Sequence, residues 1–384
     1  MRTRKQLEEL EKQGLEPYAA VSSQTKGRLY PENEHDYRTA FQRDRDRIVH
    51  TSAFRRLEYK TQVFVNHEGD YYRTRLTHTL EVAQIGRTIA RSLGINENLT
   101  EAICLAHDLG HTPFGHSGQD VMAELMKNHG GFEHNKQSFR IVTVLESPYP
   151  QFTGLNLTYE VLEGITKHAS EYDMPDGSVF IKNGYPSIEA QIANFADEIA
   201  YNNHDIDDGL QSGLITLEDL QSVQIWRENH QNIIKNFTKL NVKQQRRMMV
   251  KAILETLVTD LIKNTQIQIE KLNIKTIADV RERGKNLVAF SPEIKAKNIE
   301  LKKFLFEKLY RHYRVERMAE KAKRVLTELF HTYVNNPKIL PPDFKNDYSE
   351  NEAITRVVCD YIAGMTDRFA LDEYTKLFDP RVKV

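Results

Sequence analysis

A histidine and an aspartate stand side by side at the end of the most apolar segment of this 384-residue chain. Ile103-Cys104-Leu105-Ala106 runs directly into His107 and Asp108, so an imidazole and a carboxylate lie where the pattern predicts burial. Burying an ionised carboxylate without a partner lowers the stability of the fold by on the order of several kcal/mol. Otherwise the carboxylate takes up a proton and loses its charge. Since this segment contains no Lys or Arg, the pair needs a cation from elsewhere in the fold or a metal ion.

Two further residues have the type and position of metal co-ligands. His78 lies near the start of a helix predicted over residues 76–93, and Asp197 lies on a helix predicted over residues 187–205. On the second helix a polar stripe at spacings of three and four faces away from the apolar one, and it comprises Asn194, Asp197, Tyr201, Asp205 and Asp208. Imidazole nitrogens and carboxylate oxygens suit Mg, Mn, Fe, Ni or Zn, with coordination positions left open for water and substrate.

A His-Asp pair in an apolar helix is, by itself, more typical of a satisfied core pair than of a metal site. Here, however, seven of the fourteen histidines fall between His78 and His168. His111 and His116 follow the pair closely, and His134 comes soon after two consecutive glycines. This concentration of imidazoles favours the metal-site interpretation.

The surrounding chain predicts a mainly α architecture. Residues 62–65 and 71–73 flank a turn with Gly69 and predict one small β-hairpin. Asn98, with Glu101 three positions later, is predicted to cap a helix over residues 99–109. Since strands and helices do not alternate, we expect a helical core with additional C-terminal helices. The remaining helical patterns cover residues 5–13, 134–146 and much of 216–384.

Composition narrows the class of protein. A hydrophobic fraction of 40% indicates an ordinary globular protein. The net charge of −1 gives no general indication of binding to nucleic acid or to a membrane surface. Cys104 and Cys359 are far apart in apolar contexts, which excludes a disulfide scaffold or a cysteine zinc site. No apolar run reaches the roughly 20 residues that span a bilayer, and no secretory segment precedes the first helix. We therefore expect a cytoplasmic protein without a membrane partner.

Three segments are expected: an N-terminal arm (1–37), a core (38–212) and a C-terminal helical region (213–384) that packs on the core. Between Arg38 and Lys60 basic residues are dense and interleaved with acidic ones. By composition alone this stretch favours a solvated helix with many ion pairs.

The H…HD…D pattern of His78, His107, Asp108 and Asp197 resembles the HD-domain superfamily of metal-dependent phosphohydrolases. More narrowly, motifs spread over about residues 30–380 resemble the dGTPase branch, the deoxynucleoside triphosphate triphosphohydrolases. The motifs are DRDRI (44–48), AFRRL (53–57), KTQV (60–63), RTRLTHTLEV (73–82), HDLGHTPFGHSG (107–118), FEHN (132–135), ADEIAY (196–201) and DYIAGMTD (360–367).

This resemblance implies an HD-domain helical core and a reaction that splits a dNTP between the 5′ oxygen and the α-phosphorus. The products would be a deoxynucleoside and inorganic triphosphate. His134 matches the catalytic histidine of the family, and we assign it as general acid. His111 and His116 would act on the phosphate side, orienting water or contacting the α-phosphate.

The resemblance also suggests substrate contacts. Arg75, one turn before His78, is the expected phosphate or sugar contact, and Gln62 matches a position that reads the sugar hydroxyl. Tyr201 and Asp205 would lie against the sugar and accept from its 3′-OH, although a packing role for Tyr201 is equally open. Tyr313, like the neighbouring Tyr310, is a weaker candidate for the base pocket. One departure is Glu198, where some relatives place a basic phosphate contact.

Relatives of this kind commonly assemble as homo-oligomers and bind dNTPs as effectors, and both are expectations here. The basic cluster of Lys243, Arg246, Arg247 and Lys251 could serve an effector or nucleic acid, but a solvated helix face is favoured. Two rival functions stay open: an HD-type phosphodiesterase or nucleotidase acting on another phosphate ester, and a nucleotide-sensing regulator.

Overall fold

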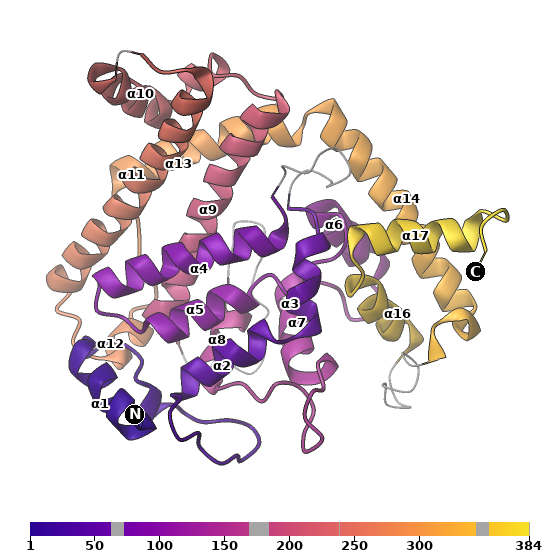
Figure 1. Cartoon of the computed structure of the whole chain (residues 1–384), viewed down its shortest axis with the longest axis horizontal. Helices are drawn as coiled ribbons and strands as arrows, with labels where there is room; N and C mark the ends of the chain where they lie inside the picture. Colours follow the sequence, from indigo (N-terminus) through magenta and orange to yellow (C-terminus); the bar gives the residue numbers. More distant parts are fainter. Residues whose placement is uncertain (63–72, 169–183, 238, 343–352, 384) are drawn as a thin grey trace. The chain divides into compact units, whose positions relative to one another are not determined.

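The computed structural model describes residues 1–62, 73–168, 184–237, 239–342 and 353–383 (Figure 1). Within these residues the chain is mainly α, as expected, and strand pairing is limited to isolated antiparallel bridges between Arg28 and Thr158 and between Thr61 and Thr74. The predicted β-hairpin falls almost wholly outside the described residues, so that prediction is not confirmed.

The chain divides into two compact units, each built from three separate segments. Unit 1 comprises Met1–Val49, His78–Ala106 and Asn156–His312, and unit 2 comprises His50–Thr77, His107–Leu155 and Tyr313–Val384.

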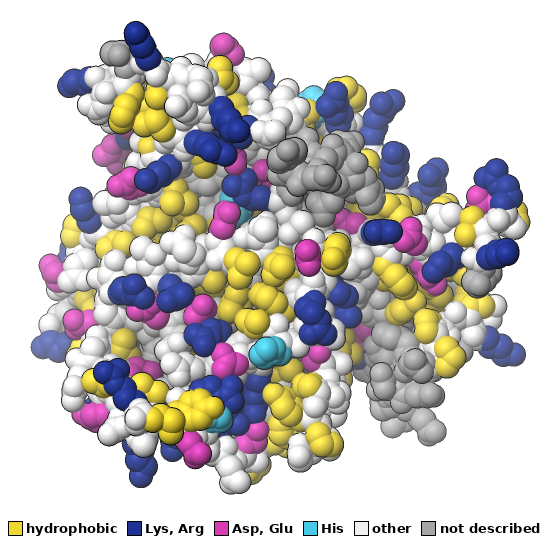
Figure 2. All heavy atoms as spheres, in the orientation of Figure 1, with side chains coloured by type: hydrophobic (Ala, Val, Ile, Leu, Met, Phe, Trp, Pro, Cys, Tyr) yellow, Lys and Arg dark blue, Asp and Glu magenta, His cyan; other side chains and the backbone are white. Residues whose placement is uncertain are grey.

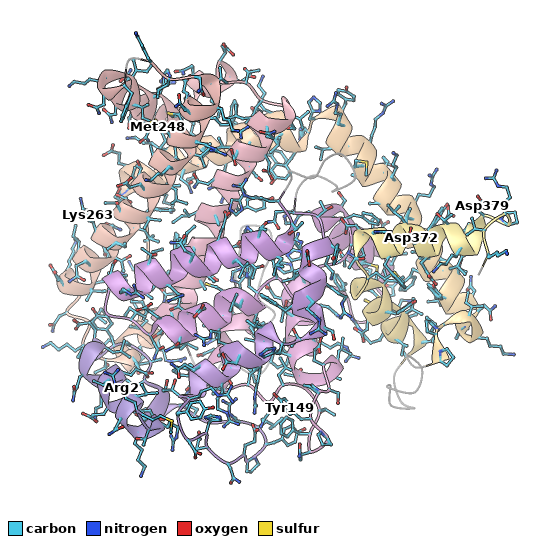
Figure 3. All side chains as sticks on the ribbon, viewed as in Figure 1. Arg2, Tyr149, Met248, Lys263, Asp372 and Asp379 are labelled. Atoms are coloured by element: carbon cyan, nitrogen blue, oxygen red, sulfur yellow. The ribbon has the colours of Figure 1, made fainter. Side chains whose placement is uncertain are left out.

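Unit 1 is organised around the long helix α9, which contacts α5, α8, α11 and α13. The Ser187 side chain caps α9 by accepting a hydrogen bond from the Ala190 amide at 3.3 Å, and Gly213 ends it in the left-handed conformation with φ 70°. Met248 and Lys263 mark α11 in Figure 3. The helices of unit 1 are α1 (Arg4–Gly14), η1 (Ser22–Gln24), α2 (Ala40–Val49), α4 (Arg75–Ser92, whose first turn belongs to unit 2), α5 (Glu97–Ala106), α8 (Tyr159–Thr166), α9 (Ile188–Ser212), η6 (Asp219–Ser222), α10 (Gln224–Asn236), α11 (Val242–Lys271), α12 (Ile277–Glu282), α13 (Pro292–Leu305) and η7 (Phe306–Tyr310).

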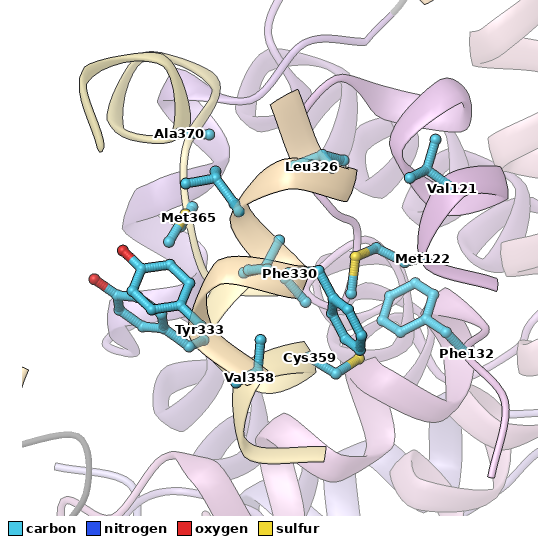
Figure 4. Packing of buried hydrophobic residues seen from close by; sticks show 14 of the residues in the cluster. Val121, Met122, Phe132, Leu326, Phe330, Tyr333, Val358, Cys359, Met365 and Ala370 are labelled. Carbon is cyan, nitrogen blue, oxygen red and sulfur yellow. The ribbon is translucent and has the colours of Figure 1, made fainter. Parts of the chain in front are cut away.

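Unit 2 has its own hydrophobic core, and helix α14 contributes one buried face of apolar side chains to it. Figure 4 shows Phe330 of this helix packed with Met122, Phe132 and Cys359. The spacing of Val325, Leu329 and Tyr333 along the sequence matches this buried face. The helices of unit 2 are α3 (Ser52–Arg56), η2 (Leu57–Tyr59), α6 (Gly115–Leu125), α7 (His134–Arg140), the π-helical turn η4 (Ile141–Leu145), α14 (Tyr313–Asn335), η8 (Pro337–Ile339), α16 (Ile354–Ala363) and α17 (Asp367–Phe378).

The predicted start and end of the apolar helix are both corrected. Helix α5 begins at Glu97, and its cap is Asn96, whose side chain accepts from the Leu99 amide at 3.1 Å. The helix ends at Ala106, so His107 and Asp108 lie in the following turn and not inside the helix. The predicted cap at Asn98 was wrong because Asn96 can close the same first turn two residues earlier.

The basic stretch before residue 60 forms ion pairs, as predicted, but part of it is buried and not solvated. Asp44 is fully buried and pairs with Arg28, while Arg47 pairs with Glu32 at 2.5 Å and donates to the Asn156 carbonyl at 3.0 Å. Arg47 thus holds α2 in unit 1 by pairing with the Glu32 carboxylate and donating to a buried carbonyl.

Figure 2 shows Lys and Arg side chains spread over the drawn face, with Asp and Glu side chains scattered among them. Both cysteines are buried, and neither forms a disulfide. Among the described helices, none combines the length and apolarity needed to cross a lipid bilayer.

Candidate active site

In unit 1, the structure brings His78 of α4 and Asp197 of α9 together. The His78 Nε2 atom lies 2.9 Å from Asp197 Oδ1, and the His78 side chain is 1% exposed while that of Asp197 is 20% exposed. His168, which follows α8, places its Nε2 3.5 Å from Asp197 Oδ2. Two imidazoles therefore converge on one partly accessible carboxylate.

His204, on α9, contacts His78 from its other side. The Nδ1 atoms of His78 and His204 are 3.2 Å apart, and His204 Nε2 is hydrogen-bonded to the Glu81 carboxylate. Neither His204 nor Glu81 is among the site residues predicted from the sequence. Their spacing was a usable signal, because Glu81 follows His78 by three residues and His204 follows Asp197 by seven, which keeps each pair on one helix face.

Tyr201 and Asp205, the predicted sugar contacts, share a partner in η7. The Tyr310 hydroxyl donates to Asp205 Oδ2 at 2.5 Å and is hydrogen-bonded to the Tyr201 hydroxyl, and the two rings stack with centroids 6.2 Å apart. Burial raises the pKa of Asp205 well above its usual value, against the opposing effect of the Tyr310 hydrogen bond. Among the described residues, Asp205 Oδ1 is buried and has no hydrogen-bond partner. A ligand hydroxyl would satisfy it.

Glu198, the departure from the family pattern, has partners on α13. Its carboxylate accepts from Asn298 Nδ2 at 2.6 Å and from Lys302 Nζ at 3.3 Å. The acidic side chain thus joins α9 to α13 within unit 1.

In unit 2, the turn that carries His107 and Asp108 is held by α7. The Ser138 hydroxyl donates to the His107 carbonyl and accepts from the Gly110 amide, both at 2.9 Å. A β-carbon on Gly110 would lie 2.2 Å from the His134 carbonyl, so only glycine permits this approach of turn and helix.

The Asp108 carboxylate is the centre of a buried cluster of nitrogens. Its Oδ1 lies 3.1 Å from Arg75 Nη1, 3.1 Å from His111 Nε2 and 3.3 Å from His107 Nε2. Burial alone would raise the pKa of Asp108, but the charges of His107 and Arg75 outweigh it and hold that pKa well below its usual value. Burial, together with the charge of Arg75, lowers the pKa of His111 well below its usual value. Asp108 is thereby kept ionised and His111 neutral.

His134 is the first residue of α7 and is fixed from several sides. Glu133 caps the helix by accepting from the amides of Asn135 and Lys136. The His134 ring stacks on His111 with centroids 4.0 Å apart, and its Nδ1 lies 2.6 Å from Gln119 Oε1. His116 meets His111 edge-on at 6.0 Å. The three predicted catalytic histidines thus form one group. Gln119, three residues after His116 on α6, also belongs to it and was not predicted from the sequence.

Arg75 and Gln62 are buried in unit 2 and only partly satisfied. Of the Arg75 guanidinium, Nη1 pairs with Asp108, but Nε and Nη2 have no hydrogen-bond partner among the described residues. The same holds for Gln62 Oε1 and His111 Nδ1. Buried polar groups are nearly always paired in folded proteins, so these atoms indicate a polar ligand with both acceptors and donors.

Tyr313 differs from the other predicted contacts. It begins α14, is 58% exposed and lies 5.9 Å from the Arg317 guanidinium. With Arg314, Arg317 and Lys321 it lines a cavity of about 660 Å³ along that helix.

The donor atoms fit a divalent cation by their chemistry. In unit 1 an imidazole nitrogen and a carboxylate oxygen already face each other at 2.9 Å. In unit 2 a second carboxylate, that of Asp108, is buried and lies beside two imidazoles. This nitrogen and oxygen set, without a thiolate, suits the metals that carry out hydrolysis.

Comparison with known proteins identifies the family. Residues 75–202 match the HD domain model and residues 288–376 match the phosphohydrolase-associated domain. A deoxyguanosinetriphosphate triphosphohydrolase-like protein of Geobacter metallireducens is 56% identical over 376 residues, covering 97% of each chain. The chain belongs to the deoxyguanosinetriphosphate triphosphohydrolase-like proteins of the HD-domain superfamily.

Other members of this dGTPase-like family are nearly as similar. The protein from Geobacter sulfurreducens is 56% identical over 98% of each chain. That from Bordetella pertussis is 52% identical over 95% of this chain and 96% of its own. The HD domain spans all four predicted ligands, and membership in this family makes the protein a metal-dependent phosphohydrolase.

Proposed function

We propose that this dGTPase-like protein is a deoxynucleoside triphosphate triphosphohydrolase whose divalent metal is held by His78, His107, Asp108 and Asp197. The observation that carries the choice of a polyphosphate substrate is the buried guanidinium of Arg75. One of its nitrogens donates to Asp108, while the other two are buried and lack a partner among the described residues. An anion with several oxygens satisfies such a group better than a neutral ligand does.

The reaction adds water to the α-phosphorus, breaks its bond to the 5′ oxygen and returns a proton to that oxygen. When bound, the metal lowers the pKa of its water and neutralises charge on the α-phosphate. His134 supplies the proton to the leaving 5′ oxygen, with Gln119 and the stacked His111 ring fixing its orientation. His111, kept neutral by burial and by Arg75, and His116 orient the water or the α-phosphate.

The remaining contacts select the sugar. Asp205, held by Tyr310, accepts from the 3′-OH through the oxygen that lacks a partner among the described residues, and Tyr201 lies against the sugar. Gln62 reads the neighbouring part of the ring. Tyr313 contributes to the base pocket.

A product analysis tests this proposal. Chelator-treated protein is supplied with Mn²⁺ and each dNTP, singly and mixed, and products are separated by anion-exchange chromatography. Triphosphate with deoxynucleoside is expected, and pyrophosphate or orthophosphate would instead support the phosphodiesterase or nucleotidase rival. Activity seen only with mixed dNTPs would reveal a nucleotide effector. Light scattering of the same samples tests the expected homo-oligomer.

A pair of matched arginine variants tests the role of Arg75. Arg75→Gln is expected to lower kcat/KM about 100-fold or more, on the scale of losing one preorganised charge contact. Arg91→Gln, on the same helix with a side chain 69% exposed, is the control and leaves activity unchanged. A fully active Arg75→Gln protein would overturn the role of this arginine in binding the polyphosphate.

A further inference from the structure

Four side chains of unit 1 form a continuous series of polar contacts between α4 and α9. From Asp197 it runs to His78 Nε2 at 2.9 Å, from His78 Nδ1 to His204 Nδ1 at 3.2 Å, and from His204 Nε2 to Glu81. The two histidines are buried, whereas the Glu81 side chain is 46% exposed. The series therefore leads from a proposed metal ligand to a carboxylate at the surface.

The polarity of the series follows from the carboxylate at its outer end. An ionised carboxylate only accepts, so the His204 nitrogen facing Glu81 carries a hydrogen. In a neutral imidazole the other nitrogen then bears the lone pair, and His204 Nδ1 accepts from His78 Nδ1. This leaves the lone pair of His78 on Nε2, which faces Asp197 Oδ1 at 2.9 Å. Two acceptors do not hydrogen-bond to each other, so in this tautomer the imidazole nitrogen and the carboxylate oxygen are placed to bind one cation together.

We propose that His204 and Glu81 are positioning residues that hold His78 in the tautomer and ring orientation required for metal binding through Nε2. The inference rests on the proposed function, because it assumes that His78 and Asp197 are metal ligands. Metal-binding histidines generally donate their second ring nitrogen to a carboxylate, a carbonyl or water. Here the acceptor is a second imidazole, and a carboxylate fixes its tautomer in turn.

The geometry argues against a purely structural role for this pair. A packing histidine needs no charged partner, yet Glu81 directs its carboxylate to a buried ring although its half-exposed position offers water as an alternative. The two links also connect the helices that carry His78 and Asp197, which the metal must hold together.

Metal affinity provides the test, since it does not require turnover. The chelator-treated protein is titrated with Mn²⁺ alone, and free Mn²⁺ is measured by electron paramagnetic resonance. His204→Leu and Glu81→Leu are each expected to weaken Mn²⁺ binding about 10- to 100-fold, the usual effect of removing an outer partner of a metal ligand. His204→Gln is expected to restore most of the affinity, because its amide oxygen can accept from His78 while its amide nitrogen donates to Glu81.

The control is His230→Leu, which removes another histidine of unit 1 that is hydrogen-bonded to glutamine side chains, from Gln221 and Gln245. It should bind Mn²⁺ like the wild-type protein. If His204→Leu and Glu81→Leu also bind Mn²⁺ normally, even with a lowered melting temperature, their role is structural and the inference is overturned. Should His204→Leu fail to fold, the half-exposed Glu81→Leu and the conservative His204→Gln still decide the matter.

A further variant separates this inference from the proposed function. His78→Ala should abolish tight Mn²⁺ binding. If His78→Ala binds Mn²⁺ like the wild-type protein, the metal site itself is wrong. If His78→Ala loses binding while the His204 and Glu81 variants keep it, only the positioning role is refuted.

Discussion

Replacing Ser138 with alanine should loosen the turn that carries His107 and Asp108. The Ser138 side chain is fully buried and makes two hydrogen bonds of 2.9 Å, to the His107 carbonyl and from the Gly110 amide. Removing the hydroxyl withdraws a partner from two buried backbone groups, each at a cost of about 1–3 kcal/mol. The higher helix propensity of alanine offsets only about 0.5 kcal/mol. The expected net loss of unfolding free energy is about 2–4 kcal/mol.

Two measurements check this value. For a cooperative unit of roughly 150–250 residues, such a loss lowers the melting temperature by about 4–16 °C. Hydrogen exchange followed by mass spectrometry should show faster exchange in the peptide that contains the Gly110 amide, because that amide loses its acceptor.

The matched control is Thr143→Val in the adjoining π-helical turn. The Thr143 hydroxyl donates to the Phe139 carbonyl of its own helical segment at 2.7 Å, so its loss should leave the Gly110 peptide unchanged. Unaltered protection of Gly110 in Ser138→Ala, with an unchanged melting temperature, would refute the idea that α7 holds this turn.

Two further predictions concern the same unit. Gly110→Ala should destabilise it by about 3 kcal/mol or more, because the new β-carbon would lie 2.2 Å from the His134 carbonyl and 2.3 Å from the Ser138 amide nitrogen. Thermal melting tests this, with Gly14→Ala as the control because the space beside Gly14 is open. Equal melting temperatures of the two variants would contradict the prediction. Burial, reinforced by the charge of Arg56, lowers the pKa of Lys60 from 10.5 to about 7. The unfolded chain therefore binds more protons than the folded protein between about pH 7 and 10.5, so the contribution of Lys60 to the unfolding free energy should rise with pH in that window. Denaturant titrations at several pH values should show that Lys60→Met removes this rise. Parallel pH profiles of the two proteins would count against the prediction.

The sequence by itself determined where most helices lie and which faces they bury, because those features depend on residues three or four positions apart. The apolar spacing of α9 and α14 required no knowledge of the rest of the chain. Residue chemistry also sufficed to nominate His78, His107, Asp108 and Asp197, since imidazoles and carboxylates in apolar segments need a counter-charge.

Only the tertiary structure decided which partners these groups have. His204 lies 126 residues from His78, and Ser138 lies 31 residues from His107, separations at which no local periodicity operates. The same reason explains the wrong cap of α5 and the buried ion pairs of α2. Whether Asn96 or Asn98 closes a helix, or whether Asp44 faces water or Arg28, depends on which distant segment occupies the neighbouring space. Burial and pairing are properties of packing, and packing is established only when the segments fold together.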